Sequence, residues 1–164
     1  MEAFATLLPM TLFDTLAASP VGLVLSVLLL TGLTTILVTL SVPGTMAPVS
    51  FVSGAVLGVG GILVVVAGAL IGTHLLFLAS RHFLADQMAR RWGARIEAMR
   101  GHLERRGAAY VVGARLGGVP HVVVSAACAA SPLTARQFLA ASLLGLLPVI
   151  TLAALAGASL TVIA

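Results

Sequence analysis

The feature that most constrains this chain is a long run without any formal charge. Between Asp14 and Arg81 there is no Asp, Glu, Lys or Arg, and His74 is the only ionisable side chain. After Arg136 the chain again runs uncharged to Ala164. A soluble domain carries roughly a quarter charged residues, whereas a bilayer core takes about 20 apolar residues per helical crossing. The sequence therefore predicts an all-α integral membrane protein, with no segment polar enough to form a separate soluble domain.

Positive charge is concentrated in one short segment. The net charge of +4 comes from nine arginines and no lysine, and seven of the nine arginines lie between Arg81 and Arg106. This segment lies between apolar runs rather than on a soluble module. It therefore fits positive charge retained at the cytoplasmic face of a membrane better than a surface for nucleic acid. We expect membrane lipids as partners and no nucleic acid.

Apolar runs and breaks divide the chain into segments. An N-terminal interfacial segment is expected at 1–20, rather than a signal peptide, because no Lys or Arg precedes the first apolar run. A single membrane domain is expected at 21–164. Its predicted parts are transmembrane helices at 21–40, 62–80 and 137–163, re-entrant hairpins at 43–61 and 112–131, and a cytoplasmic amphipathic helix at 81–106.

The first predicted hairpin rests on a break in the middle of apolar sequence. Residues 41–48 contain Pro43, Gly44 and Pro48 but no charge, which indicates a turn at or within the membrane. Irregular backbone at that depth is tolerated only where protein or a cavity covers it. If 43–61 enters and leaves by one face, the start of the 21–40 span and the basic segment lie on the same, cytoplasmic side.

Two pairs of glycines follow at a spacing of four. Gly54 and Gly58 form one pair, and Gly68 and Gly72 form the other. This spacing places small residues on one helix face and lets two helix backbones approach closely. For Gly68 and Gly72 we expect ordinary helix packing.

The basic segment has an apolar stripe of helical periodicity. Its members are Leu84, Met88, Trp92, Ile96, Met99 and Leu103. Oppositely charged pairs at i,i+4, such as Arg100 with Glu104, favour the same helix. A basic amphipathic helix of this kind is typical of one lying on a membrane surface. The alternative is a loop helix whose stripe packs on the protein's own core.

Arg115 stands out in the second predicted hairpin. A cation inside an apolar, broken segment is costly and usually faces a cavity or a partner. A guanidinium is well shaped to hold phosphate oxygens, and Gly117 and Gly118 would leave backbone N–H groups accessible to the same anion. The alternative is an arginine that extends to the interface from a segment end. His121 follows Pro120 and is interpreted as a hydrogen-bonded structural histidine.

No enzyme constellation is recognisable in the sequence. Its five acidic residues lie outside the apolar segments, and there is no HExxH, CxxC, P-loop or nucleophile elbow. The four histidines lack metal-ligand spacing, and Cys128 fits a small buried hydrophobe. We expect no catalysis, no metal and no cofactor.

Two stretches of the chain resemble the DedA superfamily, also called the VTT-domain or SNARE-associated Golgi protein family. The first runs through Ser53–Gly58, Gly68–Gly72 and Phe77–Arg81, and is similar to the family's G-x-x-(F/L)-G, G-x-x-G and F-x-x-(A/S)-R motifs. The second comprises Arg115-Leu116, Pro120, Arg136-Gln137-Phe138 and Leu144–Pro148, and is similar to its R-(L/F)-x-P-x-x-P, F and G-x-x-P motifs.

The resemblance implies two facing re-entrant hairpins and a role in lipid transport. Eukaryotic members of the family resemble phospholipid scramblases, and bacterial ones resemble undecaprenyl-phosphate carriers. By position, Arg115 matches the family's hairpin arginine. Gly118 stands where the family has its first proline, and the first hairpin lacks the acids that many bacterial members are thought to use for proton coupling.

Two functions are consistent with this sequence. The first is a lipid transporter or scramblase-like protein of the bacterial inner membrane that moves a phosphate-headed lipid. Its expected lipid-binding residues are Arg115, Gly117, Gly118, Pro120, Pro43, Gly44, Gly54 and Gly58. The second is a small scaffold that transports nothing and packs with a partner through its glycine-rich helix faces. A homo-oligomer is also possible for this chain.

Overall fold

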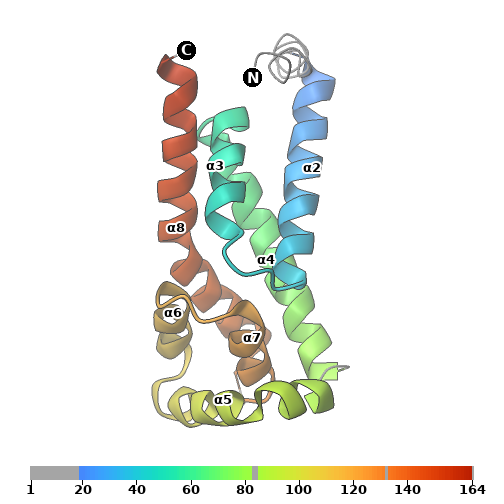
Figure 1. Cartoon of the computed structure of the whole chain (residues 1–164), viewed down its shortest axis with the longest axis vertical. Helices are drawn as coiled ribbons and strands as arrows, with labels where there is room; N and C mark the ends of the chain where they lie inside the picture. The colour runs from blue at the N-terminus through green and yellow to red at the C-terminus, as the bar shows by residue number, and fades with distance from the viewer. Residues whose placement is uncertain (1–18, 83–84, 132, 164) are drawn as a thin grey trace, which may run out of the picture.

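The computed structural model describes residues 19–82, 85–131 and 133–163, which are helical apart from short connections. The helices are α2 (Pro20–Thr39), α3 (Met46–Leu57), α4 (Gly60–His82), α5 (Ala85–Arg106), α6 (Ala108–Leu116), α7 (His121–Ala129) and α8 (Ala135–Ile163) (Figure 1). Helices α2, α4 and α8 are long and apolar enough to cross a membrane, which confirms an all-helical membrane architecture. The expected interfacial segment 1–20 lies outside the described residues up to position 18.

Local sequence sets the start of α2 and the turn that follows it. The Ser19 hydroxyl accepts a hydrogen bond of 2.9 Å from the Gly22 amide and caps α2, whose first residue is Pro20. Both are common at helix starts, because they match the free amides and the φ angle found there. After Thr39 the chain reverses through a short turn in which Gly44 has a positive φ of 77°, a conformation that glycine adopts without steric cost.

Helices α2 and α4 run parallel to each other. The hydroxyls of Thr35 and Thr39 donate to the carbonyls of Gly68 and Gly72, at 3.2 and 3.4 Å. A Cβ added at Gly68 would lie 2.7 Å from the carbonyl oxygen of Thr31. The glycines therefore allow backbone contact between the two helices, as expected for ordinary helix packing.

This parallel arrangement corrects one expectation from the sequence. The start of α2 and the basic helix α5 lie at opposite ends of the molecule (Figure 1), not on the same side. The reason is the turn at residues 40–45, which sends α3 back beside α2 so that α4 then runs in the direction of α2. The expected hairpin at 43–61 contains a single helix, α3, with the turns that flank it, and α3 forms its hairpin with α2 instead.

The second half of the chain repeats this arrangement in the opposite direction. Helices α6 and α7 form a second antiparallel pair, and α8 then runs beside α6 and ends at the far end from α5 (Figure 1). Val42-Pro43 and Val119-Pro120 lie in the two turns and are 77 residues apart, the same separation as Gly68 and Gly145. Gly145 packs on the stem of Arg115 as Gly68 packs on α2. The two halves of the chain thus form an inverted repeat of helices, with matching Val-Pro pairs in their turns.

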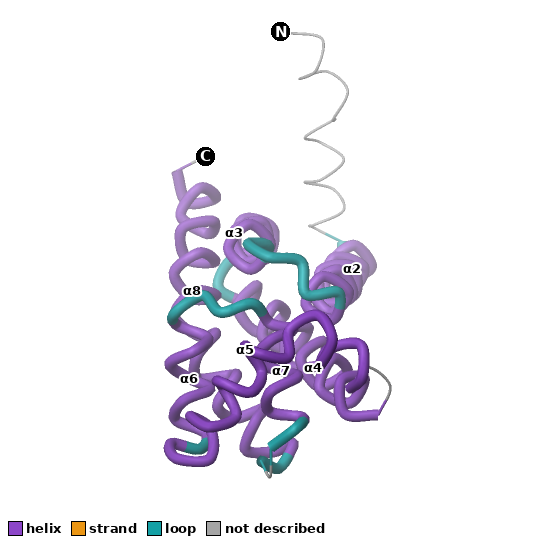
Figure 2. Tube along the Cα trace, turned by 60° about the horizontal axis from the view of Figure 1, so that its bottom comes forward, coloured by secondary structure: helices purple, strands orange, loops and turns teal. Residues whose placement is uncertain are grey.

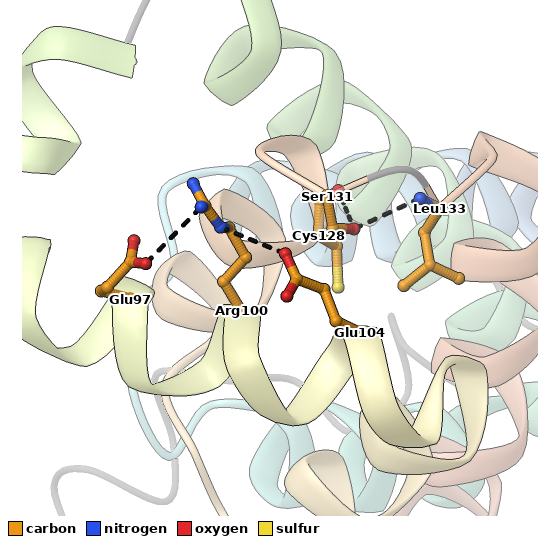
Figure 3. A network of polar contacts seen from close by, with 6 residues as sticks. All are labelled: Glu97, Arg100, Glu104, Cys128, Ser131 and Leu133. Carbon is orange, nitrogen blue, oxygen red and sulfur yellow. Dashed lines mark hydrogen bonds and ion pairs between the residues drawn. The ribbon is translucent and has the colours of Figure 1, made fainter.

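Helix α5 lies across one end of the bundle (Figure 2). Met99 and Leu103 are buried with residues of α6, α7 and α8, whereas Arg100 is exposed and pairs with Glu97 and Glu104 at 3.6 and 3.5 Å (Figure 3). The side chains of the other stripe residues, Leu84, Met88, Trp92 and Ile96, lie outside the described residues. The described end of the stripe therefore packs on the protein's own core.

Two apolar clusters form the core. The larger one surrounds α7 and includes Phe77, Phe138 and the fully buried Cys128. The smaller one joins α2, α4 and α8 through residues such as Val65 and Ile150. The outer faces of α2 and α8 carry many exposed leucines, as expected for helices surrounded by lipid.

Candidate functional site

The two turns of the repeat meet each other. The amide of Val122, in the first turn of α7, donates a hydrogen bond of 2.8 Å to the hydroxyl of Ser41 in the α2–α3 turn. Ser41 and Gly118 both have positive φ angles, of 55° and 71°. These tight reversals allow two separate helix pairs to bring their turns into contact.

Arg115 lies at this meeting point, in the last turn of α6. Only 6% of its surface is exposed. One terminal nitrogen of its guanidinium, Nη1, donates to Nδ1 of His121 at 2.5 Å, and Nη2 lies 3.5 Å from the hydroxyl of Ser142 on α8. The guanidinium carbon is 5.8 Å from the ring centre of Phe138. Three helices therefore fix the position of one buried cation.

A glycine makes room for this arginine. A Cβ added at Gly145 would lie 2.5 Å from Cβ and 3.1 Å from Cγ of Arg115. Real Cβ contacts are not that short, so α8 can approach the arginine stem only where it has no side chain. Gly145 was quoted in the sequence only as part of a family motif, and the structure places it directly against Arg115.

The positive charge of Arg115 has only neutral neighbours in the described part of the chain. The acids of that part all lie on α5, and none is paired with this guanidinium. An arginine only donates hydrogen bonds, so Nδ1 of His121 must be unprotonated and the imidazole neutral. Nε of Arg115 is buried and has no hydrogen-bond partner. Buried charges are normally paired, and this guanidinium retains unused donors in the described structure.

The role expected for Gly117 and Gly118 is wrong in one respect. Their amides are not available to an anion, because they donate to the carbonyls of Gly113 and Arg115, at 2.8 and 3.3 Å. The Val119 amide likewise donates to Ala114 at 3.0 Å. Together with the positive φ of Gly118, this is the usual way in which a helix ends on glycine. These glycines therefore shape the turn beside Arg115 rather than binding a ligand through their amides.

The other expected site residues fall into two groups. Pro43 and Gly44 lie in the α2–α3 turn, next to Ser41, and Pro120 directly precedes α7. Gly54 is buried against the backbone of Ala154 on α8, and Gly58 ends α3 with a φ of 59°. The structure thus gathers the two proline turns at Arg115 and assigns Gly54 and Gly58 to the packing and termination of α3.

Several residues were not assigned to the site from the sequence, although Phe138 was quoted as part of a family motif. Ser142 and Phe138 reach Arg115 from α8, and Ser41 joins the turns. A serine or phenylalanine in an apolar helix carries no signal of its own, because such residues are common in ordinary helix packing. Among the described residues, no three His, Cys, Asp or Glu side chains are grouped so that they could hold a metal ion.

The fold and site define an α-helical membrane protein with an inverted repeat and a buried arginine where its two turns meet. The family model of the VTT domain matches residues 42–159, which includes both turns and Arg115. The chain belongs to the VTT domain family, which is the DedA or SNARE-associated Golgi protein family. Neither a curated protein nor a solved structure matches the chain.

Proposed function

We propose that this protein moves a phosphate-headed lipid between the leaflets of a bacterial inner membrane, with Arg115 as the residue that receives the headgroup. The observation that carries the proposal is the buried guanidinium with only neutral partners and an unused Nε donor. A phosphate supplies the negative charge and the oxygen acceptors that such a group lacks, and a guanidinium can hold two of those oxygens at once.

The depth of the site supports this proposal. On α4, the contact with the end of α2 is at Gly72, ten residues before His82. On α8, the contact with Arg115 is at Gly145, ten residues after Ala135. At a rise of 1.5 Å per residue, each contact lies about 15 Å along its helix from the end near α5. That distance is half of the roughly 30 Å hydrocarbon core, so α2–α3 and α6–α7 act in the proposal as re-entrant hairpins that meet at mid-depth.

Transport in this scheme needs no bond to be made or broken. The lipid tails stay in the bilayer while the headgroup exchanges water for Arg115 and the polar atoms beside it, such as the Ser142 hydroxyl. A cation at this depth costs about 2.5 to 3.5 kcal/mol on insertion scales, and a passing phosphate would offset part of that cost. The protein would speed transport only by lowering the free-energy barrier that the headgroup meets when it crosses the hydrocarbon core.

The test is leaflet exchange in liposomes that contain the purified protein and fluorescent phospholipids. Arg115→Gln should nearly abolish exchange while the protein still inserts and remains monodisperse. Arg115→Lys should retain part of it, because the charge remains but the two-pronged geometry is lost. Arg136→Gln is the matched control, since Arg136 is exposed at the start of α8, and it should exchange lipid like the wild type.

The rival function is a scaffold that packs through its glycine faces and transports nothing. The Gly54–Ala154 and Gly68–Thr31 contacts show those faces already used within one chain, which leaves them unavailable to a partner. Equal exchange by wild type and Arg115→Gln, at matched protein amounts, would remove Arg115 from the transport path and favour the scaffold.

A further inference from the structure

We infer that His121 couples binding at Arg115 to the uptake of one proton, so that an anion and a proton enter the site together. The inference rests on the proposed function, because it takes Arg115 as the anion-binding group. It starts from the 2.5 Å contact between Nη1 of Arg115 and Nδ1 of His121. In the sequence, His121 was interpreted as a structural histidine only.

The contact fixes the protonation state of the imidazole in the anion-free site. Arginine cannot accept a hydrogen bond, so the ring must carry its proton on Nε2 and leave the Nδ1 lone pair free. In this state His121 occupies an Arg115 N–H that a phosphate oxygen would need. The Nη1 donor of Arg115 is therefore occupied in this state, although the Nε donor stays unused.

A proton on Nδ1 reverses this arrangement. The added proton takes the lone pair, so the Nη1–H···Nδ1 hydrogen bond is lost and two cations face each other in a buried place. That state is unfavourable by itself, because like charges in a low-dielectric environment repel strongly. It becomes favourable when an anion lies between them, accepting from Nη1 of Arg115 and from Nδ1–H of His121. When the anion leaves, the proton returns to water and the neutral contact re-forms.

The surroundings of His121 leave this pair isolated from other charges. Helix α7 packs against α4, α5 and α6. The ionisable groups on these helices in the described part are Arg115 and Tyr110 on α6, His74 and the terminal Arg81 and His82 on α4, and the charged side chains and His102 of α5, with Cys128 further along α7 itself. Helix α5 presents the apolar Met99 and Leu103 to this core. Arg115 is the group in direct contact with His121.

The probe should be a phosphate compound whose own charge does not change with pH. Dihexanoyl phosphatidylglycerol is a phosphodiester and meets this condition, and glycerophosphoglycerol, the same phosphodiester without acyl tails, serves as the headgroup-only arm. Calorimetric titration of the detergent-solubilised full chain, in two buffers of different ionisation enthalpy, then counts the protons taken up. For the wild type we expect uptake approaching one proton per lipid, and an affinity that rises by up to about tenfold for each pH unit of acidification.

The key variant is His121→Asn, whose side-chain oxygen lies near the position of Nδ1 and accepts a hydrogen bond but does not titrate. It should bind the lipid with no proton uptake and a flat pH profile. If His121 were only structural, its replacement by Asn would change the affinity for the lipid but would leave the pH dependence of that affinity as in the wild type. His121→Gln, tested in parallel, shows whether the flat profile follows the loss of titration rather than the choice of residue.

Each outcome separates the inference from the proposed function. If Arg115→Gln binds the lipid as tightly as the wild type, the proposed function fails and this inference fails with it. If Arg115→Gln loses binding but the wild type takes up no proton, or the His121 variants keep the wild-type pH slope, only the inference is overturned. If glycerophosphoglycerol binds with the same proton uptake as the lipid, the inference holds for the phosphodiester headgroup alone and the lipid tails add nothing.

Discussion

The amide of Val122 donates a hydrogen bond of 2.8 Å to the hydroxyl of Ser41, 81 residues earlier in the chain. This bond joins the first turn of α7 to the turn between α2 and α3. It is a direct polar link between the two halves of the inverted repeat, and the two turns would otherwise be held only by packing. We therefore expect the bond to contribute to the stability of the site.

Ser41→Ala should lower the free energy of unfolding by about 1 to 3 kcal/mol, because the Val122 amide would lose its partner in a partly buried place. The measurement is unfolding in detergent micelles. Ser159→Ala is the control, since that hydroxyl is exposed and bonds only within its own helix, and its effect should stay within about 0.5 kcal/mol. Equal stabilities of the two variants would show that the Ser41 bond is not formed.

Gly145→Ala should reduce lipid exchange nearly as much as Arg115→Gln, although it leaves the arginine in the chain. The added methyl would lie 2.5 Å from Cβ of Arg115, so the guanidinium must leave its place beside His121 and Ser142. Gly32→Ala is the matched control in an apolar helix, because nothing lies within 4 Å of its added methyl. Wild-type exchange by Gly145→Ala would contradict the packing described for α6 and α8.

Gly72→Ala should destabilise the protein by about 1 to 3 kcal/mol, the usual effect of overpacking a close contact. Its added methyl would lie 2.7 Å from the Thr35 carbonyl oxygen and 2.9 Å from Cβ of Val38. Gly93→Ala on α5 should instead be neutral or stabilise by up to about 1 kcal/mol, since its methyl meets open space in a helix. Thermal unfolding of both variants in one detergent compares them, and the opposite ranking would refute the parallel contact of α2 with α4.

The ends of the molecule should label from opposite sides of the membrane. In a Cys128→Ala background, Val59→Cys in the exposed α3–α4 turn should react with an impermeant thiol reagent added to intact cells. His102→Cys on α5 should react only after permeabilisation, because α5 carries the arginines expected to stay in the cytoplasm. Labelling of both positions from the same side would contradict a membrane crossing by α4, which lies between them.

The sequence predicted the long apolar helices well because they depend on local composition. The apolar runs that became α2, α4 and α8 are long and free of acids, and the charge-free break at Pro43 does reverse the chain. The direction of α4 relative to α2 could not be predicted in the same way. It depends on whether α3 returns beside α2 after the turn at residues 40–45, and the contact of α2 with α4 that follows joins residues 33 positions apart.

The candidate site was predicted less completely, for reasons that particular residues make clear. Arg115 was recognisable because a cation in apolar sequence is rare. Gly117 and Gly118 were interpreted as anion ligands. Glycines directly after a helical segment most often end that helix, so their position in the sequence could have predicted the role that the structure gives them. Ser142 could not be found, because a single serine in α8 gains its meaning only from the fold.

The meeting of the two turns also brings four helix ends to one level. Helices α2 and α6 end there and α3 and α7 begin there (Figure 1). A helix carries about half a positive charge at its first turn and about half a negative charge at its last. Opposite fractional charges therefore lie side by side and largely cancel at a distance, while each still acts within about one turn. A zwitterionic or anionic headgroup crossing this level would meet a favourable dipole for either sign of its charge, which a hydrocarbon layer does not provide.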